Sequence, residues 1–287
     1  MRVSTAAARG EVPGRVGQRR HTADAPADRA PRGSGGTART SRRHDDRSAR
    51  AGGPYHAPMI PRRPLARALL AVFPVLVAAH LAVQLLGAES WARPTQVLLM
   101  PALALAVLAA AERPRRRPVA LLLVALFFSW LGDALPAPAG GDTAFLLMVG
   151  GFLAAQLVYA FAFWPYRRRS ALFHRRWLLA PYLGAVAALV WLCAPHAGGL
   201  LLPVLAYGLV LGLMAVLATG VGAWAAAGGA LFLASDSLIA LRAFVPGFAL
   251  PQDGFWVMAG YCAAQACIAL GVLQRANGRP AEHSLPR

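Results

Sequence analysis

Eight long apolar segments constrain the fold of this chain more than any other feature. Each is close to the roughly 20 residues that an α-helix needs to cross the hydrocarbon core of a bilayer. The sequence is 57% hydrophobic and 14% charged, whereas soluble domains carry about 25% charged residues. We therefore predict an all-α fold, a polytopic membrane helix bundle with eight transmembrane helices. The segments cover about 65–86, 94–111, 118–135, 143–164, 177–194, 199–218, 221–241 and 255–274.

Arginines between the segments predict how the chain is oriented. The net charge of +17 comes from arginine alone, because the sequence has no lysine. With eight spans, most of the arginines that flank the segments fall on one side, and such a bias marks the cytoplasmic side. Both termini are then cytoplasmic, in a multi-pass protein of the cell membrane. The arginines on this side are Arg62, Arg63, Arg67, Arg113, Arg115, Arg116, Arg117, Arg167, Arg168, Arg169, Arg175, Arg176, Arg275, Arg279 and Arg287.

Residues 1–58 differ from the rest of the chain in composition. They are rich in Arg, Gly, Ala, Ser and Pro and hold almost no large apolar residues. Such a segment cannot bury enough apolar surface to fold, and it contains no apolar run of the kind that marks a signal peptide. We expect a disordered tail over 1–58, or the product of an upstream start with Met59 as the alternative. An eight-span membrane domain over 59–276 and a short cytoplasmic tail over 277–287 follow.

Two aspartates interrupt the apolar segments. Asp133 lies near the end of the third segment and Asp236 lies in the seventh, between Ser235 and Ser237. An ionised side chain at the centre of a membrane helix costs roughly 2.5–3.5 kcal/mol on insertion scales, and such residues usually face a bundle interior or a wet cavity. Each aspartate is the sixteenth residue of its predicted span, so we expect both carboxyls at matching depth in the outer third of the membrane.

Helical spacing adds polar neighbours to the two aspartates. Residues three or four apart share one face of a helix, which groups Ser129 with Asp133, Gln156 with Tyr159, and Tyr261 with Gln265. Arg93 at the start of the second span and Arg242 at the end of the seventh are not among the cytoplasmic arginines, and both lie on the side of the carboxyls. We predict Asp133 and Asp236 as catalytic residues. The candidate substrate-binding residues are Arg93, Arg242, Ser129, Ser235, Ser237, Gln156, Tyr159, Tyr261 and Gln265.

Each of these residues also has a purely structural explanation. A buried aspartate can pair with an arginine, amides and hydroxyls can tie helices together, and arginines at helix ends can reach for the interface. Two acids, two arginines and several amides at similar depth on one side favour a functional site. No histidine falls in an obvious polar stripe, and no nucleophile elbow or metal-ligand spacing is present. We expect neither a metal nor a cofactor.

A weak internal repeat relates the two halves of the chain. Gly132-Asp133-Ala134-Leu135 is similar to Ser235-Asp236-Ser237-Leu238, and Ala154-Ala155-Gln156 is similar to Ala263-Ala264-Gln265. Apolar segments built from few residue types also match one another by chance. Duplication would give two four-helix halves of parallel orientation, and chance similarity remains the alternative.

Five short motifs resemble the YhhN-type lysoplasmalogenase family in order and spacing, over about residues 90–275. The two aspartate motifs carry most of the likeness. The family usually shows Lys-Pro where this chain has Arg93-Pro94, a change that keeps the charge and alters the donor geometry. The motifs are Arg93-Pro94, Phe128-Ser129-Trp130-Leu131-Gly132-Asp133, Ala155-Gln156-Leu157-Val158-Tyr159, Ser235-Asp236-Ser237-Leu238-Ile239-Ala240 and Tyr261-Cys262-Ala263-Ala264-Gln265.

The resemblance implies an eight-span hydrolase that cleaves the vinyl ether bond of a lysoplasmalogen to a fatty aldehyde and a glycerophospho-head alcohol. A vinyl ether hydrolyses through protonation of its β-carbon and capture of the resulting oxocarbenium ion by water. That chemistry suits paired carboxyls, one protonated as general acid and one ionised. The two arginines, Arg93 and Arg242, would hold the phosphate.

Other classes of function remain beside the hydrolase. A small proton-coupled transporter would use the same aspartates as a proton relay, and a non-catalytic lipid-binding or assembly protein would need neither carboxyl. The basic composition does not indicate a nucleic-acid partner, because no recognition motif accompanies it. The expected partners are a lysophospholipid substrate and membrane lipids, and the sequence does not indicate an oligomeric state.

Overall fold

Each of the eight predicted segments forms one long α-helix in the computed structural model, which describes residues 64–112, 114, 116–174 and 176–278. Within this part of the chain all eight helices are long and apolar enough to cross a membrane, so the predicted fold class is confirmed. Short 3-10 turns flank α5. The helices are α1 (Pro64–Leu85), α2 (Glu89–Ala110), α3 (Arg117–Ala134), α4 (Gly141–Phe163), α5 (Leu179–Cys193), α6 (Leu201–Ala218), α7 (Ala223–Phe244) and α8 (Asp253–Asn277).

The predicted ends of the helices need small corrections. Helix α2 begins at Glu89 rather than near residue 94, because its first turns continue through Ser90 to Ala92 despite Pro94. Arg93 therefore lies inside α2, one turn from its start, and does not open it. The proposed tail over 1–58 and residues 279–287 of the expected C-terminal tail lie outside the described residues. Asn277 is the last residue of α8.

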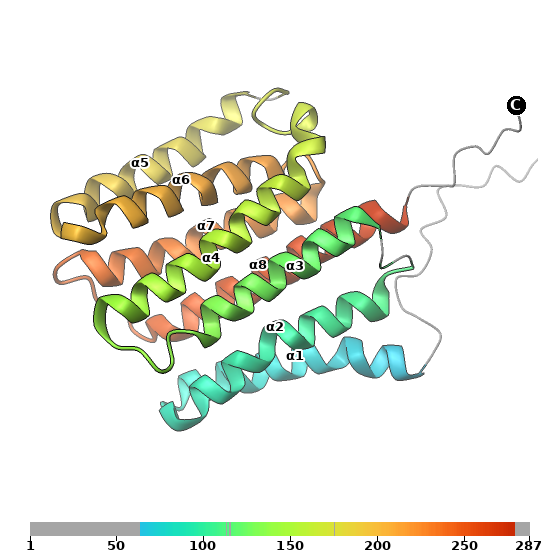
Figure 1. The fold of residues 1–287 in the computed structure, drawn as a ribbon, viewed down its shortest axis with the longest axis horizontal. Coiled ribbons are helices and arrows are strands. Elements are labelled where there is room, and N and C mark those ends of the chain that lie inside the picture. The colour runs from blue at the N-terminus through green and yellow to red at the C-terminus, as the bar shows by residue number, and fades with distance from the viewer. Residues whose placement is uncertain (1–63, 113, 115, 175, 279–287) are drawn as a thin grey trace, which may run out of the picture. The chain divides into compact units, whose positions relative to one another are not determined.

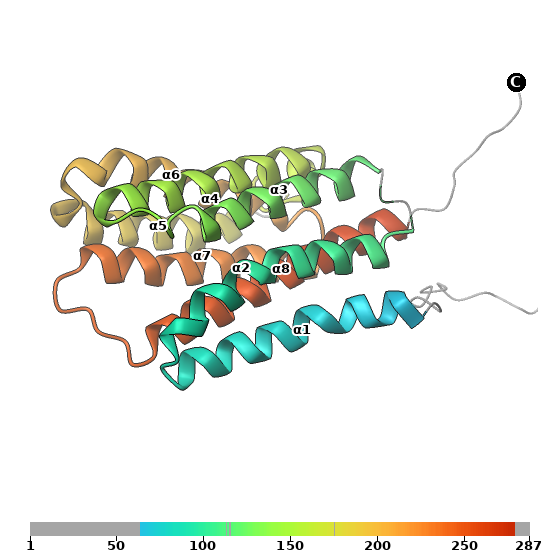
Figure 2. The same ribbon diagram turned by 60° about the horizontal axis from the view of Figure 1, so that its bottom comes forward.

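The helices run lengthwise beside one another and successive helices point in opposite directions (Figure 1). Helices α1 and α2 form one edge of the bundle and α5 and α6 form the opposite edge in Figure 1, and α1 stays at the edge in the turned view of Figure 2. Helix α8 is the most buried helix and packs against α7, α1, α3 and α2. The remaining inner positions belong to α3, α4 and α7, so the central helices include both that carry the aspartates.

Glycines allow the closest helix contacts around α7. A Cβ atom at Gly228 would lie 2.7 Å from the Ala264 carbonyl oxygen on α8. At Gly229, on the opposite side, it would lie 2.9 Å from the Ala215 Cα atom on α6. Small residues of this kind let helix backbones approach in a bilayer, where apolar lipid offers no hydrophobic drive for association. The adjacent glycines are therefore close-packing positions.

Helices α3 and α4 approach one another just as closely beside Asp133. A Cβ atom at Gly151 would lie 2.5 Å from the Gly132 nitrogen and 2.6 Å from the Gly132 Cα atom. A Cβ atom at Gly132 would in turn meet the Phe152 ring at 3.0 Å. The backbone that carries Asp133 is thus held directly against α4.

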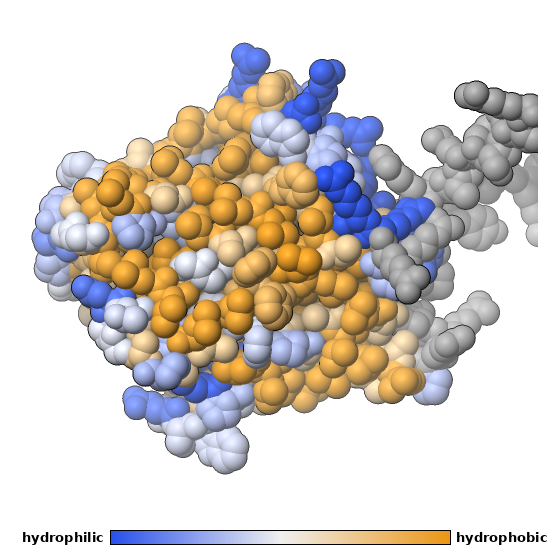
Figure 3. Space-filling view, viewed as in Figure 1, coloured by the Kyte–Doolittle hydropathy of each residue, from blue (hydrophilic) through white to orange (hydrophobic). Residues whose placement is uncertain are grey.

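Hydrogen bonds between helix ends close the end of the bundle that carries the arginine-rich connections. Arg116 donates from Nη1 to the Ala276 carbonyl at 2.5 Å, and Arg275 donates from Nη2 to the Gly220 carbonyl at 3.4 Å. Apolar side chains cover the middle of the face in Figure 3, and hydrophilic side chains gather toward its ends. The chain is thus a multi-pass membrane protein, and the assignment of this end to the cytoplasm stays a prediction.

Candidate active site

Both aspartates line one cavity of about 610 Å³. Helices α1, α2, α3, α4, α7 and α8 contribute to its wall, and so do Gly87, Pro136 and Gln252 from the connections. The cavity therefore reaches the end of the bundle opposite the arginine-rich connections. Asp133 and Asp236 come 16 and 13 residues after the first residues of α3 and α7, which is about 24 and 20 Å along the helix axes. Their depths are similar, and their carboxylates interact electrostatically.

Asp133 is buried and accepts two hydrogen bonds. Gln96 donates from Nε2 to Oδ1 at 2.8 Å, and the Tyr261 hydroxyl donates to Oδ2 at 3.0 Å. The Tyr261 ring stands edge-on between Phe152 and Phe232, with a centroid separation of 5.6 Å to each. Packing from α4 and α7 thus fixes the donor that holds Asp133.

Asp236 is only half-buried, because its carboxyl faces open space inside the bundle. Its Oδ2 atom accepts a short hydrogen bond from the Tyr207 hydroxyl of α6, while no hydrogen bond from the described residues reaches Oδ1. Asp236 also lines a second, small apolar pocket of about 40 Å³ between α4, α6 and α7. It therefore stands where a polar cavity meets an apolar one.

Three predicted residues form a buried chain next to the cavity. The Tyr159 hydroxyl donates to Gln265 Oε1 at 2.6 Å, and Gln265 Nε2 donates to Ser129 Oγ at 3.0 Å. Their side chains come from α4, α8 and α3. Gln265 lies one helical turn from Tyr261 and Ser129 lies one turn from Asp133, but none of the three residues lines the cavity. The structure brings these residues together as a network behind Asp133.

Gln156 lies on the same α4 face as Tyr159 and beside the Tyr207 hydroxyl. It is fully buried, yet neither its amide nitrogen nor its amide oxygen makes a hydrogen bond of good geometry with the described residues. A buried amide without partners costs free energy, about 1–3 kcal/mol for each unsatisfied group. Packing of the helices alone does not require a buried amide at this place, so the region beside Asp236 is more polar than a purely structural helix contact.

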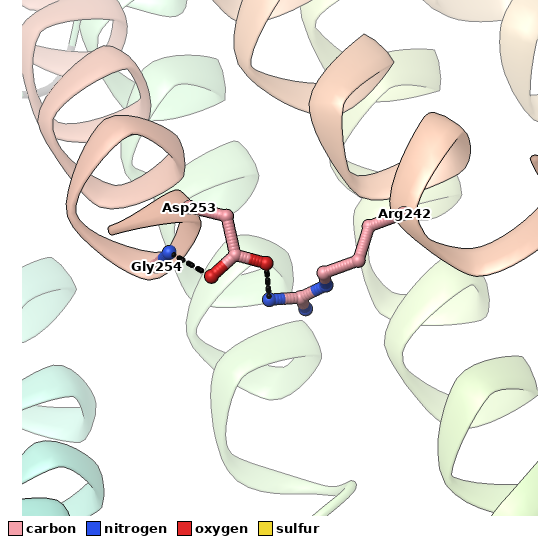
Figure 4. A network of polar contacts seen from close by, with 3 residues as sticks. All are labelled: Arg242, Asp253 and Gly254. Atoms are coloured by element: carbon pink, nitrogen blue, oxygen red, sulfur yellow. Dashed lines mark hydrogen bonds and ion pairs between the residues drawn. The ribbon is translucent and has the colours of Figure 1, made fainter. Parts of the chain in front are cut away.

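The two predicted arginines line the mouth of the cavity in different states. Arg242 donates from Nη1 to Asp253 Oδ2 at 3.1 Å, and the Gly254 amide donates to the other oxygen of Asp253 (Figure 4). Arg93 is exposed and has no ion-pair partner among the described residues. Neither arginine contacts Asp133 or Asp236, so the described part of the chain does not use these carboxyls as structural ion pairs.

The two serines that flank Asp236 point to different places. Ser235 lines the cavity, but its hydroxyl donates to the Val257 carbonyl at 2.8 Å and ties α7 to α8. Ser237 donates to the Leu233 carbonyl of its own helix at 2.6 Å and lines a separate groove. The structure therefore does not bring Ser237 to the aspartates, because a two-residue step turns the side chain about 200° around a helix.

Sequence reasoning missed the residues that hold the carboxylates most directly. Gln96 stands three residues after Arg93 and so shares its helix face, a signal that was available. Tyr207 sits in an apolar segment with no other polar residue to mark it. His80 is fully buried, with Nδ1 2.7 Å from Thr95 Oγ1, and Nε2 3.4 Å from Nε2 of Gln84, which lines the cavity. The expectation that no histidine joins a polar stripe is wrong for His80.

The arrangement provides two carboxyls of unlike surroundings in one pocket, with positive charge at the mouth and apolar space beyond. Such a pair can give a proton and stabilise a positive charge on one ligand. Within residues 64–278, so far as they are described, no three His, Cys, Asp or Glu side chains come together as a metal site.

Comparison with known proteins agrees with the site motifs. The chain is 34% identical to proteins named Lysoplasmalogenase from Mycobacterium bovis and Mycobacterium tuberculosis, over 179 residues in each case. The match covers 57% of this chain and 64% of each relative, so it spans less than two thirds of the relatives' length. No solved structure matches the chain significantly. The model of the YhhN family matches residues 91–272, which include both aspartates and the residues that line the cavity except Val83, Gln84, Gly87 and Glu89, and the chain therefore belongs to the YhhN family.

Proposed function

We propose that this protein hydrolyses the vinyl ether bond of lysoplasmalogen-type lysophospholipids, releasing a fatty aldehyde and a glycerophospho-head alcohol. The observation that carries the proposal is the pair Asp133 and Asp236, two carboxyls from α3 and α7 on one cavity. Membership of the YhhN family and relatives named Lysoplasmalogenase support the substrate class.

The cavity offers a place for each part of such a substrate. The phosphate would bind Arg93 and Arg242 at the mouth, where guanidinium groups form charge-assisted hydrogen bonds. An ammonium head group would find Glu89 and Asp253 on the same rim. The small apolar pocket of about 40 Å³ between α4, α6 and α7 would take only the part of the aliphatic chain next to Asp236. The vinyl ether then lies between the polar and the apolar part, beside the carboxyls.

The surroundings of the two carboxyls suit different roles. Both oxygens of Asp133 accept hydrogen bonds from donors, an arrangement that suits an ionised carboxylate. Asp236 accepts one bond, on Oδ2, so Oδ1 is available to carry a proton toward the cavity. We assign the general acid to Asp236, which also lies nearer the pocket for the aliphatic chain and hence nearer the β-carbon.

The reaction then proceeds in balanced steps. Asp236 gives its proton to the β-carbon, and the double bond becomes an oxocarbenium ion that the charge of Asp133 stabilises. A water molecule adds to the α-carbon and loses a proton to Asp133. The hemiacetal collapses to the aldehyde and the alcohol as Asp133 gives its proton to the departing oxygen and Asp236 takes the proton of the hydroxyl group. Both carboxyls return to their starting states, and the net change is the consumption of one water molecule. Tyr207 and Tyr261 act as positioning residues, since each orients one carboxyl.

The test uses the full chain in detergent with an alkenyl lysophosphatidylethanolamine and measures aldehyde release. A transporter would show no turnover without a sealed membrane. Asp133→Asn and Asp236→Asn should each lower turnover by about 10²–10⁴-fold, the usual contribution of an acid or base. In the double variant the losses should not add, because residues of one unit are non-additive. Asp142→Asn, an exposed aspartate at the start of α4, is the matched control and should keep full activity.

Two further measurements separate the roles. In D2O the aldehyde should carry one deuterium on the carbon next to the carbonyl, because that carbon receives the proton. Azide supplies a negative charge and a nucleophile that needs no base, so it should restore substrate consumption in Asp133→Asn and not in Asp236→Asn. Rescue of Asp236→Asn alone would reverse the assignment. Full aldehyde release by either well-folded Asn variant would rule out the two-carboxyl mechanism.

A further inference from the structure

We propose that a groove between α5 and α7 binds an anionic phospholipid of the surrounding bilayer. The groove has a volume of about 730 Å³ and is lined by α5, α7 and the segment that joins α4 to α5. It shares no lining residue with the cavity of Asp133 and Asp236. The inference is therefore independent of the proposed hydrolysis.

Small side chains open this groove. Ala226, Ala230 and Ala234 follow one another at intervals of four residues on α7, so they lie along one helix face, and all three line the groove. Ala185 faces them from α5. Helix α5 buries only Cys193 along its whole length, so it leaves the groove unfilled. In a membrane such apolar space is covered by lipid.

The length of the groove matches one leaflet. From Ala226 to Ser237 the lining of α7 covers eleven residue steps, which is about 16 Å at 1.5 Å per residue. Half of a hydrocarbon core of about 30 Å is about 15 Å. A chain that enters at the end of Ala226 would thus reach the middle of the bilayer. Ser237 lies at the inner end of the groove, and its hydroxyl donates a hydrogen bond to the Leu233 carbonyl of α7. This end of the groove therefore offers no free reactive group.

Positive charge stands at the entrance of the groove. Arg169, His174 and Thr219 line this end, where hydrophilic side chains gather at the turn from α4 to α5 (Figure 3). Arg169 is exposed and forms no ion pair with the described residues. A guanidinium binds phosphate through paired hydrogen bonds, and basic pockets between membrane helices bind anionic head groups. This charge selects an anionic phospholipid over a zwitterionic one.

The experiment uses the full chain in detergent and compares phosphatidylglycerol with phosphatidylcholine of identical chains. Retention of lipid is measured by native mass spectrometry, and thermal stability is measured in parallel. Phosphatidylglycerol should bind more tightly and raise Tm more. Arg169→Gln should weaken this binding about fivefold, which corresponds to about 1 kcal/mol for one basic residue. Ala230→Phe should block the groove and abolish the difference between the two lipids.

Two matched variants serve as controls. Arg168→Gln removes the same charge one residue away, and Ala227→Phe adds the same ring on an exposed position of α7; neither residue lines the groove. Both should keep the preference for phosphatidylglycerol. If these controls weaken binding as much as Arg169→Gln and Ala230→Phe, general charge and apolar surface attract the lipid and the groove is not its site. Equal binding of both lipids by the wild-type chain would also overturn the proposal.

Discussion

Gly151→Ala tests whether the contact between α3 and α4 holds Asp133 in place. The added Cβ atom would lie 2.5 Å from the Gly132 nitrogen, whereas non-bonded carbon atoms pack at about 3.5–4.0 Å. Both sides of this contact are backbone, so no rotamer change relieves it. The helices must part by about 1 Å, and overpacking of this kind costs about 1–3 kcal/mol.

The same displacement also moves the carboxyl of Asp133, because Gly132 directly precedes it in α3. The carboxylate oxygens lie 2.8 Å from Gln96 Nε2 and 3.0 Å from the Tyr261 hydroxyl. A shift of about 1 Å takes both beyond the usual limit of about 3.2 Å for a hydrogen bond. Misplacement of a reacting group by that amount can lower turnover by about 10²-fold.

The assay measures aldehyde release and Tm for Gly151→Ala beside Gly150→Ala. Gly150 lies on the same helix, and a Cβ atom there would meet nothing within 4 Å. Because alanine favours a helix over glycine by about 0.5–1 kcal/mol, the control should be as stable as the wild type or more so. If Gly151→Ala keeps both stability and turnover, the close approach does not position Asp133 and the reasoning fails.

Four further outcomes are expected. Tyr207→Phe removes the donor to the carboxylate of α7 and should lower kcat about tenfold, less than the loss of about 10²–10⁴-fold expected for an acid or base itself, with KM unchanged; Tyr166→Phe, which keeps its ring over an arginine, should change neither. Arg93→Gln should raise KM for the phosphate-bearing substrate and leave kcat nearly unchanged; a loss confined to kcat would contradict a binding role. A reporter at the C-terminus should read as cytoplasmic and one near Gly140 as external, and the reverse would invert the proposed orientation. A chain that starts at Met59 should insert and turn over normally, and lost activity would reveal a role for residues 1–58.

The membrane-spanning helices could be located from the sequence because the length of a span depends only on the number of consecutive apolar residues. A helix must match the thickness of the hydrocarbon core, so apolar length alone locates α1 to α8 to within a few residues. The start of α2 was missed because the residues before Pro94 look like a connection in composition, yet they continue the helix. The internal duplication suggested by the two aspartate motifs stays a prediction.

The candidate site was only partly visible in the sequence. Asp133 and Asp236 stood out because a carboxyl in an apolar segment is costly and therefore rare. Tyr207 carries no such signal, since a tyrosine in an apolar segment is ordinary until its hydroxyl meets a carboxylate. We expected the Arg242 guanidinium to be free to bind a ligand, whereas it forms an ion pair with Asp253, eleven residues further along the chain.

By itself the sequence determined that the chain crosses the membrane, how many helices it uses, and which two carboxyls those helices carry into the apolar layer. Only the tertiary structure decided which side chains meet. It turned Ser237 away from the aspartates, brought Gln96 and Tyr261 to Asp133, and left a groove beside the alanines of α7. The reason is that the rotation of each helix depends on where its glycines and alanines meet a neighbour's backbone, and those meetings join segments that lie far apart in the sequence.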